Sequence, residues 1–173
     1  MRGGALRKEG PAFLVVLLLL WILQLGVAGW TVLWGVTPAL IPLGVTLAGT
    51  WRGPTYGGVF GLAAGLIWIS QVPGYPGMAL PGLCLVGLLA GLIRPGLPQF
   101  GVTFLRAAAG MLLWEGGRLL LHLLSEGAAL GGLAVLAGRE WLWTIPWFVL
   151  LYPLFWLFFR TRKKGACHDR PAT

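Results

Sequence analysis

The sequence predicts an all-α, polytopic integral membrane protein, with six transmembrane helices in one compact bundle and both termini in the cytoplasm. Hydrophobic residues make up 57% of the 173 residues, charged residues make up only 10%, and the mean hydropathy is +0.82. In an ordinary soluble domain about a quarter of the residues are charged. The chain also contains six apolar segments whose lengths approach the ~20 residues that a membrane helix requires. The total length fits a single domain.

The six segments follow one another with short connections. The first has a basic start like a signal peptide, but its apolar run continues to Trp34, so we expect an uncleaved first helix. The second contains Pro38 and Pro42 and the sixth contains Pro146 and Pro153, so both should bend and face protein on one side. The predicted spans are 13–34, 37–51, 55–72, 77–93, 99–124 and 142–159.

These spans divide the chain into three parts. A cytoplasmic segment, 1–12, precedes the membrane domain, 13–159, and a basic cytoplasmic tail, 160–173, follows it. Within the membrane domain the longest connection is 125–141, a stretch rich in Gly, Ala and Leu. We expect it to lie flat at the outer leaflet.

Lysine and arginine residues predict the orientation. Only Arg139 lies in the loops expected on the outer side. Cytoplasmic loops are enriched in Lys and Arg, so both ends should be cytoplasmic. We interpret the net charge of +8 as contact with anionic lipid headgroups. Nucleic-acid binding is disfavoured because the chain has no basic domain. Ten of the 13 basic residues fall on the inner side: Arg2, Arg7, Lys8, Arg52, Arg94, Arg160, Arg162, Lys163, Lys164 and Arg170.

Glycines at helical spacing mark the third and fourth spans. Gly57, Gly61 and Gly65 are spaced i, i+4, i+8 and share one face, and Gly87 and Gly91 do the same on the next span. Small residues at this spacing let helix backbones approach closely in lipid. Two alternatives follow: the stripes pack within the chain, or they form a docking face for a partner's single membrane helix.

The fifth span carries charges well inside it. Glu115 and Arg118 are spaced i, i+3, and Arg118 and His122 are spaced i, i+4, so all three can share a face. Ionisable residues in a membrane segment are candidates for function. One alternative is that the three residues lie at the outer interface and pair with one another. The other is that they face a partner or a small outward-facing cavity.

Catalysis is not indicated by this sequence. Acid–base chemistry by two carboxylates requires a pair, and Glu115 is the only acid inside a predicted span. Zinc sites use three or four His, Cys or acidic ligands, and the two histidines, His122 and His168, fall on opposite sides. We therefore expect no catalytic residues, no metal and no cofactor, and we expect the protein not to be an enzyme.

Two regions carry a resemblance to a known family. The stretch RGPTYGGVFGLAAGLIW (52–68), the Pro/Gly turn at 72–78 and the helix 79–92 that ends in LAGLIR resemble the rod shape-determining protein MreD. The last span, its two prolines and the basic tail also resemble this family. The acidic residue that the family often has near the end of the third span is absent, and Ile69 or Ser70 stands about there.

The resemblance implies a non-enzymatic scaffold of the bacterial cell-elongation complex in the inner membrane, with a role in cell shape and peptidoglycan synthesis. Its expected partner is an MreC-like bitopic membrane protein. Through that partner it would act indirectly with MreB and with the synthase formed by RodA and a penicillin-binding protein. A homodimer is a further option. The MreD family is similar in fold to the S-components of energy-coupling-factor transporters, so the alternative is a substrate-binding subunit of a vitamin transporter.

Overall fold

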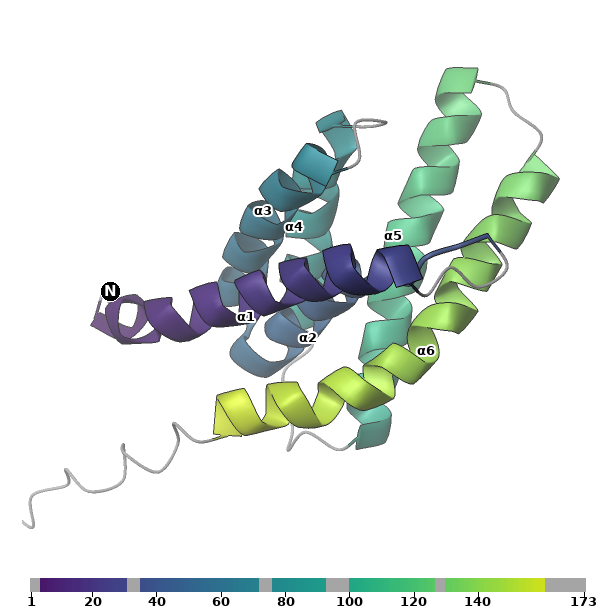
Figure 1. Ribbon diagram of the computed structural model, residues 1–173. Coiled ribbons are helices and arrows are strands. Elements are labelled where there is room, and N and C mark those ends of the chain that lie inside the picture. Colours follow the sequence, from purple (N-terminus) through teal and green to yellow (C-terminus); the bar gives the residue numbers. More distant parts are fainter. Residues whose placement is uncertain (1–3, 31–34, 72–75, 93–99, 127–129, 161–173) are drawn as a thin grey trace, which may run out of the picture.

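The computed structural model describes residues 4–30, 35–71, 76–92, 100–126 and 130–160 of the chain (Figure 1). All of its regular elements within these ranges are helices, as the sequence predicts. Among the described residues, none of the helices combines the length and the apolar character needed for a membrane crossing. The helices are α1 (Gly4–Trp30), α2 (Leu40–Arg52), α3 (Pro54–Gln71), α4 (Pro76–Leu92), α5 (Phe100–Glu126) and α6 (Leu130–Arg160).

The first two helices begin at residues other than those predicted for their spans. Helix α1 begins at Gly4 and so includes most of the segment expected to precede the bundle, whereas residues 31–34 lie outside the described part. Helix α2 begins three residues later than predicted, directly after Pro38 and Ala39. Proline disfavours helical geometry in the residue before it, so Pro38 explains why no helix begins at Thr37.

Most of 125–141, expected to be a connection between two spans, is helical in the structure. Residues 130–141 form the first part of α6, which runs without interruption for 31 residues. No proline stands between Leu130 and Thr144 to stop the helix, and an ion pair of Glu140 with α5, described below, holds this part against its neighbour. Figure 1 shows that α6 bends along its length. We attribute the bend to Pro146 and Pro153, which each remove a helix hydrogen bond.

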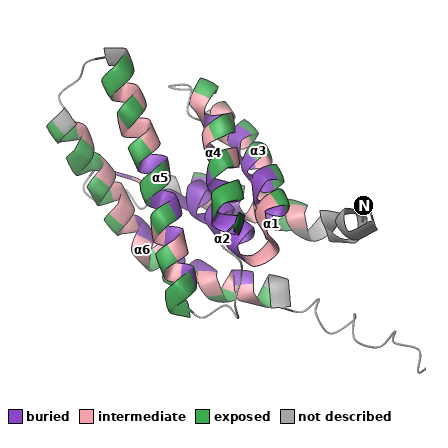
Figure 2. Cartoon of the chain, turned by 180° about the vertical axis from the view of Figure 1, so that it is seen from behind, coloured by how far each residue is buried: buried purple, intermediate pink, exposed green. Residues whose placement is uncertain are grey.

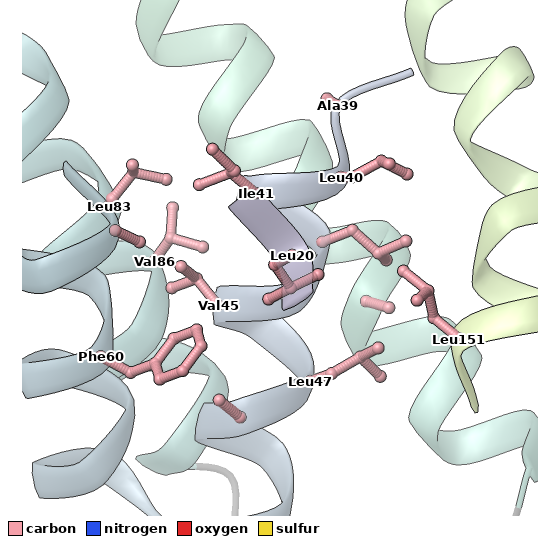
Figure 3. Close-up of a cluster of buried hydrophobic side chains, with 14 of the residues drawn as sticks. Leu20, Ala39, Leu40, Ile41, Val45, Leu47, Phe60, Leu83, Val86 and Leu151 are labelled. Atoms are coloured by element: carbon pink, nitrogen blue, oxygen red, sulfur yellow. The ribbon is translucent and has the colours of Figure 1, made fainter. Parts of the chain in front are cut away.

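Helix α2 is the centre of the molecule. It has only 13 residues, and every one from Leu40 to Thr50 is buried. Figure 3 shows its side chains meeting those of α1, α3, α4 and α6, with Leu20, Phe60 and Leu151 among the surrounding residues. A helix that is apolar on all sides is expected in an interior position. The other helices are buried mainly where they face this core and exposed on their outer surfaces (Figure 2).

Candidate functional site

The glycine stripes of α3 and α4 face each other inside the chain. A methyl group added to Gly57 would lie against the carbonyl oxygen of Gly87, and one added to Gly87 would lie against the carbonyl oxygen of Gly57. Gly49 of α2 joins the same contact, because a methyl group there would also meet the Gly87 carbonyl. Three backbones therefore converge at a point that only residues without a side chain can occupy.

The remaining predicted glycines extend this contact in both directions. A methyl group at Gly61 would lie 2.6 Å from the carbonyl carbon of Leu83, and one at Gly65 would lie 3.0 Å from the carbonyl oxygen of Ala79. At the other end, Gly91 packs against the backbone of Gly53 and Pro54. The five predicted packing candidates thus serve contacts within the chain. A partner helix would reach these stripes only by separating α3 from α4.

The polar residues of α5 form an ion-pair cluster that includes α6. The Nη1 atom of Arg118 donates to both carboxylate oxygens of Glu115 at 3.2 Å and to Oε2 of Glu140 at 3.0 Å. The side chains of Glu115 and Glu140 are only 6% and 15% exposed, and that of Arg118 is 36% exposed. His122 lies one turn further along α5 and is half-buried. We call Glu115, Arg118 and Glu140 the α5–α6 cluster.

Glu140 was missed as a member of this cluster. The pairing of Glu115 with Arg118 follows from their i, i+3 spacing, but Glu140 is 22 residues from Arg118 in sequence. It was expected in a flat connection rather than in a helix antiparallel to α5. The available signal was its charge, because an acid beside a predicted apolar span is a candidate for pairing with a cation.

A second polar site at the buried amino end of α2 was also missed. The Nε2 of Gln24 donates to the carbonyl of Pro38 at 3.2 Å, and its Oε1 accepts from the N–H of Leu40 at 3.0 Å. The N–H of Ala39 donates to Oγ1 of Thr144 at 3.1 Å. The first N–H groups of a helix have no partner within it, so α1 and α6 supply the acceptors that α2 lacks. A polar residue such as Gln24 within an apolar span was the only signal.

An apolar groove lies between α5 and α6, over α2. Its empty volume is about 260 Å³ when the open mouth is included, but only about 20 Å³ of it admits a water-sized sphere. Among the described residues of its wall, the Thr144 hydroxyl and the Trp141 indole are the polar groups. The α5–α6 cluster closes one end, because Glu115 is one turn beyond Met111 on α5 and Glu140 directly precedes Trp141 on α6. The groove is lined by Leu43, Phe104, Ala107, Ala108, Met111, Trp141, Thr144, Ile145 and Phe148.

These features define what the described residues can do. The α5–α6 cluster can hold two helices together, and the groove between them is lined mainly by apolar side chains. Within the described ranges, no three His, Cys, Asp or Glu side chains gather where they could hold a metal ion. Comparison of the chain with protein-family models, with curated proteins and with solved structures found no match.

Proposed function

We propose that this protein is a polytopic membrane scaffold of the MreD type, which acts by binding other membrane chains. The observation that carries the proposal is the number of large apolar side chains exposed on the outer surface of the bundle. A soluble monomer rarely exposes contiguous apolar patches of more than a few hundred Å², whereas lipid tails solvate such a surface. The exposed large side chains include Leu14, Leu18 and Ile22 on α1, Leu62 and Leu66 on α3, Leu85 and Leu92 on α4, Leu105, Leu112 and Leu120 on α5, and Val149, Leu150 and Leu157 on α6.

The interior supports the same proposal. The backbone groups at the start of α2 and the acids of the α5–α6 cluster are satisfied by other parts of the chain. In lipid every polar group must find its partner within the protein. Paired groups such as these inside, with apolar side chains outside, are the distribution that a bilayer favours. The basic residues at one side of the predicted spans then orient both termini toward the cytoplasm.

A scaffold fits this arrangement better than a transport subunit. The resemblance of 52–94 and of the last span to MreD supports an MreC-like partner with one membrane helix, and through it a link to MreB and to the RodA synthase. The alternative S-component function would require a pocket with several convergent polar groups. In the described part of the chain, the groove between α5 and α6 offers only the Thr144 hydroxyl and the Trp141 indole.

The test is where the native chain is located and which proteins it binds. We expect it in the membrane fraction after a carbonate wash, with reporter fusions active on the cytoplasmic side at both ends. An affinity tag should recover a one-span protein with an extracytoplasmic coiled coil. Recovery of a transporter ATPase pair would support the alternative. A chain that remains in the supernatant, or a carboxyl end on the outer side, would contradict the proposal.

A further inference from the structure

The adjoining ends of α5 and α6 are less buried than the rest of the bundle. Among the residues whose burial is described, Glu115 is the last buried residue of α5 and Thr144 is the first of α6. Between these two points, over 116–124 and 131–143, every residue is exposed or half-buried. In Figure 1 the upper ends of both helices stand apart from α3 and α4. We call these two stretches the outer arm.

Both helices are weakened where the outer arm begins. Helix α5 has two consecutive glycines, 116–117, and glycine is among the least favourable residues in a helix interior. On α6, Pro146 has no N–H to donate to the carbonyl of Leu142, four residues earlier. Sharp kinks in helices occur mainly at proline and at pairs of glycine or serine residues. Because Arg118 contacts Glu140 across the antiparallel pair, the glycine pair and Leu142 lie at about the same level.

Arg118 makes two kinds of bond at this level. Its Nη1 donates to Oε2 of Glu140 at 3.0 Å, which joins α5 to α6 within the outer arm. The same atom donates to both carboxylate oxygens of Glu115 at 3.2 Å, and Glu115 lies on the inner, buried side of the glycine pair. The first bond makes the two helices of the arm one unit, and the second ties that unit to the core.

The core side of the weak point on α6 is fixed separately. The Thr144 hydroxyl accepts from the N–H of Ala39 at 3.1 Å, which holds this turn of α6 to the start of α2. The same hydroxyl donates to the carbonyl of Glu140 at 2.7 Å, a kind of bond that often bends helices. A change in the direction of the outer arm would therefore occur beyond Thr144 and leave the core in place.

We infer that the outer arm is a hinged unit, which swings about the glycine pair of α5 and the Leu142–Pro146 turn of α6, and that the Glu115–Arg118 bond latches it in the observed position. Such a swing goes beyond the proposed function and does not depend on it, because it needs no partner. A bend of about 20° at Gly116 would displace Leu124, which lies about 12 Å further along α5, by about 4 Å.

Distances between pairs of spin labels measure this swing in the purified full-length chain in detergent micelles. Cys84→Ala and Cys167→Ser first remove the native cysteines, so that labels attach only at introduced ones. An arm–core pair, an arm–arm pair and a core–core pair are compared by double electron–electron resonance. The labelled positions are all exposed: Leu66 and Leu124 for the arm–core pair, Leu124 and Val135 for the arm–arm pair, and Leu66 and Leu105 for the core–core pair.

Glu115→Leu removes the latch but leaves Arg118 paired with Glu140. We expect it to broaden the arm–core distance distribution by about 4 Å and to leave the arm–arm and core–core distributions unchanged. Glu115→Gln is the matched control, because its side-chain oxygen can still accept from Arg118, and it should keep the distribution of the unsubstituted chain. Far-UV circular dichroism shows whether each variant has folded.

A second set of variants tests the hinge itself. Gly116→Ala with Pro146→Ala stiffens both weak points, because alanine favours the helix and restores the missing N–H. Added to Glu115→Leu, this pair of substitutions should return the arm–core distribution to its original width. Gly138→Ala with Pro153→Ala changes the same residue types of α6 away from the hinge and should not. If Glu115→Leu does not fold, the two double variants are compared in the otherwise unchanged chain, where only the first should narrow the arm–core distribution.

Three results would overturn the inference. One is an arm–core distribution in folded Glu115→Leu equal to that of the unsubstituted chain. Another is broadening of the arm–arm pair, since the two helices would then separate rather than swing together. The third is an equal effect of the hinge substitutions and their control pair on the arm–core distance.

Discussion

Gly61 provides a direct test of how α3 and α4 are held together. In Gly61→Ala the new methyl carbon would lie 2.6 Å from the carbonyl carbon of Leu83 and 2.9 Å from the Cα of Cys84, against an ordinary contact of 3.4 Å or more. The difference between 3.4 and 2.6 Å requires the two backbones to separate by at least about 0.8 Å, because the carbonyl oxygen of Leu83 lies closer still. A gap of 0.5–1 Å forfeits roughly a quarter to a half of the attraction between the atoms that line it.

The expected loss of stability follows from this displacement. Overpacking a tight contact costs about 1–3 kcal/mol, and we expect the upper end because both surfaces are backbone. Replacing glycine by alanine stabilises a helix by about 1 kcal/mol, which partly offsets this loss. The net destabilisation by Gly61→Ala should therefore be about 2 kcal/mol. Gly116→Ala is the matched control, since nothing outside its own stretch of α5 lies within 4 Å of its added methyl group, and it should stabilise the chain by up to about 1 kcal/mol.

The assay is reversible unfolding in mixed micelles with increasing SDS, followed by far-UV circular dichroism and tryptophan fluorescence. The two variants should differ by about 3 kcal/mol in free energy of unfolding. Equal stability of Gly61→Ala and Gly116→Ala would refute the close approach of α3 and α4 at this point.

Two further substitutions test the polar contacts by the same unfolding assay. Thr144→Val preserves the shape of the side chain but leaves the buried N–H of Ala39 without its acceptor, so it should destabilise the chain by about 1–3 kcal/mol. The control, Thr55→Val at an exposed position, should change stability by less than about 0.5 kcal/mol. Similar values for both variants would argue against the hydrogen bond. Arg118→Gln leaves two adjacent carboxylates at a largely buried site and should cost about 3 kcal/mol, whereas the exposed Arg139→Gln should be near neutral. A neutral Arg118→Gln would mean that the cluster does not hold α5 to α6.

Sequence reasoning succeeded where one helix determines the pattern by itself. The i, i+4 spacing of Gly57, Gly61 and Gly65 identifies a close-packed face, and the i, i+3 spacing of Glu115 and Arg118 identifies an ion pair, because helix geometry alone places these residues together. The same spacing does not say what lies opposite. The facing surface of α4, at Leu83 and its neighbours, became known only from the structure.

The contacts that escaped prediction join residues far apart in the chain. Thr144 is 105 residues from Ala39, and Gln24 is 16 residues from Leu40 across a segment broken by proline. Their pairing depends on where α2 begins inside the bundle, and no local pattern encodes that position. The late start of α2 leaves the N–H groups of Ala39 and Leu40 buried, and side chains from two other helices accept their hydrogen bonds. The need for acceptors was predictable from the buried helix end, but their identity was not.

One turn of α6 connects the two polar sites. The hydroxyl of Thr144 donates to the carbonyl oxygen of Glu140 at 2.7 Å and accepts from the N–H of Ala39 at 3.1 Å, while the Glu140 carboxylate accepts from Arg118 at 3.0 Å. These bonds tie the same turn to the amino end of α2 on one side and to α5 on the other. Rotation of α6 about its axis would break at least one of them. Buried polar groups that lose a partner are costly, so this turn fixes the register of α6 before its prolines redirect the rest of the helix.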